Sequence, residues 1–323
     1  MRAAHVAALM FSAAAGSLAA AEIVLQTPVD CTLGDDCFIQ HYVDHDPGPD
    51  GSDFQCGPLA NDGHSGTDFR VATLQDMLDG VDVVAAAAGV VTGTRDGMAD
   101  KVYTSADAAA LNGRSCGNGV SVDHGDGWTT QYCHLKRGSI TRRTGAEVRP
   151  GDVLGQIGLS GQTAFPHVHV TVRKDGAVVD PFDPDGQITC GAPSAHTLWD
   201  APLAYVPGAV MEVGFADSVP SFDAIQSGDA ARGTLPPDAP ALVVFGYVLG
   251  GQPADRMRLT IEGPSGTIID NAVSLDRTQA ELFRAVGKRL TTDGWPEGTY
   301  EGTVKLVRKG QVISTRTGSV IIR

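Results

Sequence analysis

The sequence predicts a mostly β protein in which an antiparallel sheet domain is followed by a small Ig-like β-sandwich. Two observations carry this prediction. Valine-rich runs such as "VDVVAAAAGVVTG" and "HVHVTVRKDGAVV" recur between turn signals from Gly63 to Asp183, and short strands at this spacing are typical of antiparallel β-structure. The same alternation returns near the C-terminus in "RMRLTIEGPSGTII" and "VISTRTGSVIIR".

Length and charge limit the protein class. The 323 residues suffice for about two domains. The formal net charge is −14 and the isoelectric point is about 4.9. Because binding to phosphates requires a basic face, the charge argues against a nucleic-acid partner.

The first residues, "MRAAHVAALMFSAAAGSLAAAE", predict a secretory signal peptide over residues 1–21. One arginine precedes an apolar run that ends in small residues, and we expect cleavage after Ala21. A membrane helix is the alternative, but the run is short and interrupted by serine and glycine. With no cysteine at the cleavage point and no later apolar span, we expect no membrane anchor and a periplasmic or secreted location.

Export changes the interpretation of the six cysteines. An even number in an oxidising compartment predicts three disulfides. A cysteine-based zinc cluster is the alternative, but the chain contains no C-x-x-C pair. The segments "GNGVSVDH" and "GWTTQYCH" flank a turn at Gly125 and Asp126. Antiparallel pairing about that turn predicts a Cys116–Cys133 disulfide.

Composition divides the rest of the chain into four parts. Residues 22–62 are rich in turn formers and predict an irregular, disulfide-stapled extension. Residues 63–192 form the expected sheet domain, with a short helix between Arg95 and Gly117. Residues 193–207 are rich in proline and alanine and suit a linker, and residues 208–323 form the sandwich. Within the sandwich, "TQAELFRAVGKRL" has helical periodicity.

The stretch "PHVHV" places two histidines on one side of a predicted strand. Residues two apart in a strand face the same way, so His167 and His169 share a face while Val168 and Val170 enter the core. A structural histidine pair is the alternative interpretation.

Upstream, "DGHSGTDFR" contains an H-x-x-x-D spacing formed by His64 and Asp68. Its two glycines make a helix improbable, but a loop that enters a strand can aim both side chains at one point. Two imidazoles and a carboxylate leave a fourth tetrahedral position for water, which is typical of a catalytic zinc site. No H-E-x-x-H supplies a glutamate base. Proton transfer is therefore left to histidines, with His134 and His167 as candidates.

Five motifs in this order resemble one family. They are "HSGTDF", "GVVTG", "GNGVSVDHGDGWTTQYCHL", "VRPGDVLGQIGLSGQT" and "PHVHVTVRKDGAVVDP". The stretch from Gly63 to Pro181 is similar to the lysostaphin/LytM-type zinc metallopeptidases, also called duplicated hybrid motif endopeptidases. This resemblance implies a predominantly antiparallel sheet with a groove over the metal, and cleavage of peptidoglycan crosslinks.

Carried over by residue, the resemblance implies that His64, Asp68 and His169 bind Zn²⁺ and that His134 and His167 are catalytic. It implies an exported endopeptidase that hydrolyses amide bonds in peptidoglycan stem peptides or crosslinks, by attack of a zinc-bound water assisted by these two histidines. Two alternatives remain. One is a non-catalytic scaffold that activates a partner amidase, as some relatives do. The other is a zinc peptidase that acts on glycine-rich proteins.

The extension carries two further histidines, His41 and His45, in "HYVDHD". Some relatives cover their zinc with a preceding segment. One hypothesis is therefore that the extension contacts the groove and supplies a latent fourth ligand. The alternative is that both are ordinary loop histidines. Phe165 and the insertion after Arg95 depart from the family pattern and are expected to shape the groove.

Overall fold

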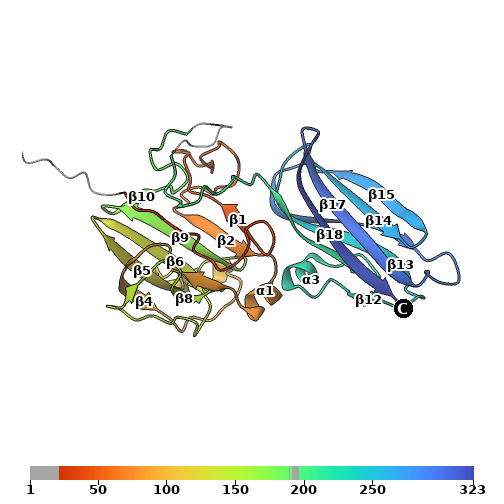
Figure 1. Ribbon diagram of the computed structural model, residues 1–323, viewed down its shortest axis with the longest axis horizontal. Helices are drawn as coiled ribbons and strands as arrows, with labels where there is room; N and C mark the ends of the chain where they lie inside the picture. Colours follow the sequence, from red (N-terminus) through yellow and green to blue (C-terminus); the bar gives the residue numbers. More distant parts are fainter. Residues whose placement is uncertain (1–21, 189, 191–195) are drawn as a thin grey trace, which may run out of the picture.

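The computed structural model describes residues 22–188, 190 and 196–323. The predicted signal peptide and part of the predicted linker lie outside the described residues. Strands dominate both halves of the molecule, which lie side by side with two short helices between them (Figure 1). The mostly β, antiparallel fold is therefore confirmed. Within the described ranges, no helix is long and apolar enough to cross a membrane.

The first half is built on an eight-stranded sheet of order β1-β2-β9-β6-β5-β4-β7, with β10 paired to β9. All of these neighbours are antiparallel. Its strands are β1 (Cys37–His41), β2 (Thr67–Val71), β4 (Gly89–Arg95), β5 (Asn118–Gly125), β6 (Trp128–Leu135), β7 (Glu147–Val148), β9 (His167–Lys174) and β10 (Ala177–Val179). A separate pair consists of β3 (Asp82–Val84) and β8 (Val153–Gln156).

The second half contains two sheets that share one apolar core. The smaller sheet has the order β11-β13-β16 and the larger one β12-β18-β17-β14-β15. Their strands are β11 (Ala209–Ala216), β12 (Thr234–Leu235), β13 (Ala241–Gly251), β14 (Arg256–Gly263), β15 (Gly266–Ser274), β16 (Gln279–Arg289), β17 (Gly298–Arg308) and β18 (Gln311–Ile322). Two facing sheets agree with a sandwich, and its Ig-like type stays a prediction.

The periodicity of "TQAELFRAVGKRL" indicates a helix, and this indication is wrong, because these residues form strand β16. The strand pairs along nearly its whole length with β13, which is already bonded to β11 on its other edge. Without β16, the N–H and C=O groups on one edge of a buried strand would have no partner. Tertiary hydrogen bonding therefore overrides the local helical pattern.

The described part of the chain also contains three short helices and a 3₁₀ turn: α1 (Leu74–Asp79), α2 (Ala108–Leu111), α3 (Phe222–Ser227) and η1 (Ser105–Asp107). The short helix predicted between Arg95 and Gly117 is confirmed by α2. Helices α1 and α3 lie where the halves meet (Figure 1). An apolar cluster also joins the halves there, with Phe38 and Ala72 from the first and Phe245 among its members from the second.

Three disulfides are present: Cys31–Cys37, Cys56–Cys190 and Cys116–Cys133. The predicted number and the predicted Cys116–Cys133 pair are both confirmed. The extension is less irregular than expected, since β1 lies within it and pairs with β2 at the edge of the main sheet. This pairing brings the end of β1 to the same face as the histidine motifs.

Candidate functional site

Strand register brings the two sequence motifs together at the centre of the main sheet. In the β2–β9 ladder, Asp68 lies opposite His169. On the other side of β9, Cys133 of β6 also lies opposite His169, and His134 follows it. Val168, Val170 and Val172 are at most 2% exposed, so the alternating strand packs its valines into the core and turns its histidines the other way. A groove of about 550 Å³ opens over these histidines.

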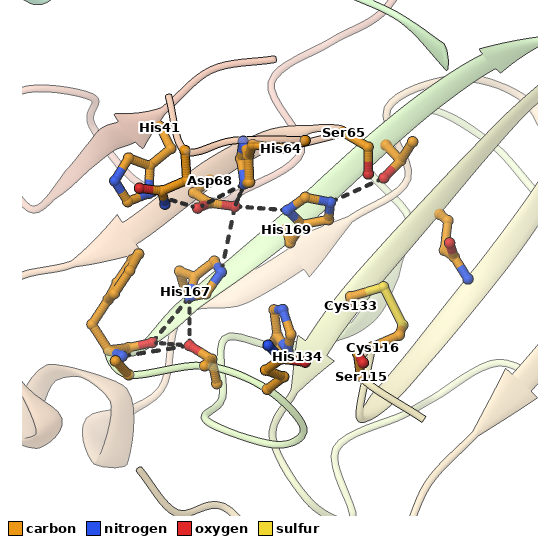
Figure 2. Close-up of a pocket in the computed structure, with 18 of the residues that line it drawn as sticks. His41, His64, Ser65, Asp68, Ser115, Cys116, Cys133, His134, His167 and His169 are labelled. Atoms are coloured by element: carbon orange, nitrogen blue, oxygen red, sulfur yellow. Dashed lines mark hydrogen bonds and ion pairs between the residues drawn. A yellow bond between two sulfur atoms is a disulfide. The ribbon is translucent and has the colours of Figure 1, made fainter. Parts of the chain in front are cut away.

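Asp68 is the point where the polar side chains meet (Figure 2). Its Oδ1 lies 2.8 Å from His169 Nδ1 and 3.2 Å from His64 Nε2. His167 Nε2 lies 3.4 Å from the same oxygen, and His41 Nδ1 lies 3.1 Å from Oδ2. Asp68 is 3% exposed. The structure therefore brings the three histidines of the two motifs, together with His41, around one buried carboxylate.

The second nitrogen of each predicted metal-binding histidine is occupied. His64 Nδ1 lies 2.7 Å from the carbonyl oxygen of Tyr42, so Nδ1 is the donor, and the neutral ring directs its Nε2 lone pair toward Asp68. His169 Nε2 lies 3.1 Å from Thr171 Oγ1 while its Nδ1 faces Asp68. Metal-binding histidines characteristically commit their other nitrogen to such a partner. Both rings are thus held in the orientation that a metal ligand requires.

Close packing explains why Gly66 of "HSGTDF" has no side chain. A Cβ on Gly66 would lie 2.7 Å from His169 Nε2 and 2.5 Å from the carbonyl oxygen of Val170. Such distances are too short for nonbonded atoms, so a larger residue would force the loop away from β9. Gly66 therefore lets the loop that carries His64 lie directly against His169.

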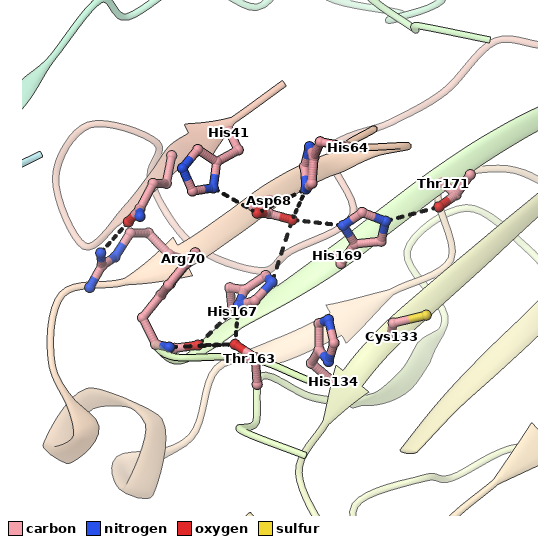
Figure 3. A network of polar contacts seen from close by, with 12 residues as sticks. His41, His64, Asp68, Arg70, Cys133, His134, Thr163, His167, His169 and Thr171 are labelled. Carbon is pink, nitrogen blue, oxygen red and sulfur yellow. Dashed lines mark hydrogen bonds and ion pairs between the residues drawn. The ribbon is translucent and has the colours of Figure 1, made fainter. Parts of the chain in front are cut away.

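His134 and His167 lie beside this cluster, with ring centroids 4.7 Å apart. His134 Nδ1 lies 2.8 Å from the Ser160 carbonyl oxygen. His167 Nδ1 lies 2.9 Å from the Phe165 carbonyl oxygen. Since a carbonyl only accepts, both rings carry their proton on Nδ1 when neutral. The Nε2 lone pair of His134 is then available, whereas Nε2 of His167 faces Asp68 (Figure 3).

The backbone at His134 is held in an uncommon conformation. Its φ is 64°, in the left-handed region that residues other than glycine rarely adopt. The His134 N–H donates to the Cys116 carbonyl oxygen at 2.8 Å, and the Cys116–Cys133 disulfide ties the same two segments together. Such a conformation persists where surrounding contacts fix it.

The Asp68 carboxylate governs the charge state of the cluster. Burial by itself opposes ionisation of Asp68, but His64 and His167 hold the pKa of its carboxyl well below the usual range. Burial also opposes protonation of His64, yet the Asp68 carboxylate raises the pKa of that imidazole to about 9. Burial and the neighbouring imidazoles of His167 and His169 lower the pKa of His134 to about 3. At neutral pH, Asp68 is therefore anionic and His134 is neutral.

The donor atoms fit a zinc ion. Ligand atoms of His41, His64 and Asp68 lie within 4.8 Å of one another, and so do those of Asp68, His167 and His169. The ligand set predicted from sequence takes His64 from the first group and His169 from the second, and Asp68 belongs to both groups. Imidazole nitrogens and carboxylate oxygens are ligands that zinc accepts. Assignment of these three as ligands stays a prediction.

The structure separates the two histidines of the extension. His41 lines the groove, whereas His45 Nε2 lies 2.8 Å from Asp180 Oδ2 in a neighbouring pocket. His41 is 5% exposed and its ring centroid is 5.6 Å from that of His64. The hypothesis of a fourth ligand therefore applies to His41 and not to His45.

Arg70, at the same face as Asp68, was not identified from sequence. Its guanidinium lies 4.8 Å from the centroid of the Phe165 ring, and that ring stacks on His167 at 4.3 Å. Arg70 is two residues after Asp68 in β2, so strand alternation already placed it on the histidine face. Only the fold could show that Phe165 lies between Arg70 and His167.

Residues 62–181 match the family described as Peptidase family M23. The DD-carboxypeptidase/endopeptidase Mpg of Neisseria meningitidis is 32% identical over 108 residues, which are 31% of this chain and 24% of Mpg. The peptidoglycan DD-endopeptidase ShyA of Vibrio cholerae is 35% identical over 82 residues, 24% of this chain and 19% of ShyA. The matched region thus spans about a quarter or less of these relatives.

Among solved structures, a Pseudomonas aeruginosa protein described as a peptidase M23 is 28% identical. The match covers 49% of this chain and 48% of that one, with a TM-score of 0.30.

Proposed function

Residues 62–181 belong to peptidase family M23, and on that premise we propose that the protein is an exported zinc endopeptidase that hydrolyses amide bonds in peptidoglycan peptide crosslinks. The observation that carries the proposal is the buried Asp68 carboxylate in contact with His64 and His169, whose outer nitrogens are both occupied. Beside it, His134 keeps its Nε2 lone pair for proton transfer, and His167 presents Nε2 toward Asp68.

His64 Nε2, Asp68 and His169 Nδ1 would hold the zinc ion. Bound there, zinc would supply Lewis acidity, which polarises a substrate carbonyl and makes a water nucleophilic at neutral pH. The Tyr42 carbonyl and the Thr171 hydroxyl fix the two imidazole rings. We therefore expect replacement of Asp68, His64 or His169 to abolish tight zinc binding.

His134 and His167 would move the protons. With Nδ1 bonded to the Ser160 carbonyl, His134 accepts a proton at Nε2 and returns it to the leaving nitrogen. His167, bonded through Nδ1 to the Phe165 carbonyl, likewise presents Nε2. Once protonated, either ring stabilises negative charge that develops on the amide oxygen. The pair shares these roles, which the geometry does not divide.

The substrate class and location are supported indirectly. Mpg and ShyA, which share the matched region, are described as a DD-carboxypeptidase/endopeptidase and a peptidoglycan DD-endopeptidase. Three disulfides suit an oxidising compartment such as the periplasm or the extracellular space. The complete donor set weighs against a scaffold that only activates a partner amidase, and glycine-rich proteins remain the alternative substrate.

We also propose that the extension closes one side of the groove through His41. Its Nδ1 reaches Asp68 Oδ2, so it would act as an additional donor to the metal. The His41 ring is only 5% exposed, so it forms part of the groove wall and not of a free surface.

The experiment compares the zinc-loaded protein with His134→Ala on purified sacculi, and identifies the released fragments by mass spectrometry. Our proposal predicts new peptide termini with the wild type and none with the variant, at equal zinc content. Cleavage of a glycine-rich protein but not of sacculi would identify the alternative substrate. Activation of an added amidase, with no cleavage by the protein itself, would identify a scaffold.

A further inference from the structure

The groove continues along β9 beyond the histidines. His167, His169, Thr171 and Arg173 alternate with the buried valines and so lie on the groove face. Figure 3 shows His167, His169 and Thr171 following one another along this strand. Arg173 is among the residues that line the groove. Four strand positions separate it from His169, a distance of roughly 13 Å.

Arg173 has no partner for its charge among the described residues. Its Nη1 is buried and makes no hydrogen bond, and no carboxylate lies within ion-pair distance of it in the ranges that the structure describes. The residues opposite it, Thr129 on β6 and Val178 on β10, are neutral. A partly buried guanidinium without a charge partner, and with an unpaired buried nitrogen, lowers the stability of the fold.

The charges around the groove distinguish Arg173 from the other arginines. Of the groove-lining residues that the structure describes, Arg173 is the only lysine or arginine, in a protein of net charge −14. Other buried or half-buried arginines have partners: Arg70 and Arg308 pair with Glu281 and Asp255. Arg95 and Arg284 donate to backbone or amide oxygens instead. A single uncompensated cation in a substrate groove indicates that its counter-ion arrives with the substrate.

We propose that Arg173 is a specificity-determining residue that binds a carboxylate of the peptide substrate. The inference rests on the proposed function, because it takes the groove to hold a peptide. The anionic groups of a peptide are carboxylates, which the planar guanidinium fork of arginine binds through two parallel hydrogen bonds. In an extended peptide lying along β9, this carboxylate is about four residues from the scissile amide.

The test uses zinc-loaded full-length mature protein and synthetic branched peptides that carry one carboxylate. In one series, the carboxylate is on a side chain at successive positions from the scissile bond, and in another it is the chain end. Each peptide has a matched carboxamide. Wild type, Arg173→Gln, Arg173→Lys and Arg149→Gln are compared, where Arg149 is an exposed arginine outside the groove.

We expect the wild type to favour one carboxylate position by roughly tenfold or more in KM over its carboxamide, as for a hydrogen bond to a charged group. Arg173→Gln removes this preference with kcat and zinc content nearly unchanged, and Arg173→Lys restores part of it. Arg149→Gln behaves as wild type. The series that shows the preference identifies a side-chain or a terminal carboxylate.

Equal KM values for carboxylate and carboxamide in the wild type would overturn the inference, as would a preference that survives in Arg173→Gln. If the wild type with bound zinc cleaves none of the peptides, the proposed function fails separately. Equilibrium binding of the same peptide pairs to wild type and Arg173→Gln by calorimetry then decides the role of Arg173 without turnover.

Discussion

Glu281→Gln is expected to destabilise the protein by breaking an ion pair between its two halves. Arg70, on β2, is fully buried, and its Nη1 lies 2.5 Å from Glu281 Oε1 on β16. Tyr247 donates its hydroxyl proton to the same carboxylate. The substitution keeps the shape of the side chain and removes the charge.

The expected loss is about 3 kcal/mol in the free energy of unfolding. Removing one partner of a buried ion pair typically costs about 3–5 kcal/mol, because the remaining charge stays buried. Here the lower end applies, since Arg70 keeps the carbonyl oxygens of Val71 and Ala72 and the amide oxygen of Gln40 as acceptors. The glutamine introduced at position 281 also still offers one oxygen.

The assay is urea unfolding followed by circular dichroism at pH 7, with Asp270→Asn as the matched control. Asp270 forms an ion pair with Arg258 at the surface, and such pairs contribute little. We expect the control to unfold like the wild type. A loss in Glu281→Gln no larger than in the control would refute the reasoning.

The pH dependence adds a second check on the same variant. Burial by itself raises the pKa of Glu281, but Arg70 and the hydrogen bonds outweigh it and lower the pKa below its ordinary value of 4.5. A lowered carboxyl pKa stabilises the fold fully above the unfolded value and loses that effect as pH falls through the folded value. The gap between wild type and Glu281→Gln should therefore narrow below about pH 4.5. A gap that stays constant down to pH 3 would contradict this.

Three further outcomes are expected. His134→Ala should retain zinc by elemental analysis but lose peptidase activity, and equal loss of both would show that His134 instead supports the metal. Replacing Cys116 and Cys133 by serine should lower the unfolding free energy by about 3 kcal/mol, because the bridge closes a sequence separation of 17; unchanged urea midpoints would contradict this. His41→Ala should weaken zinc binding in a chelator competition while leaving some activity, and unchanged affinity would exclude His41 as a donor.

The central strand and its histidines were predictable because their signals are local. The alternation of valine and polar residues from His167 to Arg173 indicates both the strand and its two faces. The H-x-x-x-D spacing indicates the other residues of the site, His64 and Asp68. The Cys116–Cys133 bridge was predictable for the same reason, since one hairpin pairs the two segments. Residues that act within one turn or one hairpin leave a recognisable pattern.

What the sequence did not predict depends on contacts between distant segments. β16 has a helical pattern that pairing with β13 overrides. The sequence offered both His41 and His45 as possible ligands, and only the pairing of β1 with β2 shows that His41 is the one that reaches Asp68. The partner of Arg70, Glu281, lies in the other half of the chain. Such pairings follow from how sheets associate in space, which local periodicity does not encode.

The most direct test of the central claim is mass spectrometry of the fragments that zinc-loaded protein releases from purified sacculi, beside His134→Ala with equal bound zinc. Cleavage at a peptide crosslink by the wild type, absent in the variant, is the result that a zinc centre at Asp68 assisted by His134 and His167 predicts. Release of the same fragments by His134→Ala, or none by a wild type that holds zinc, would contradict it.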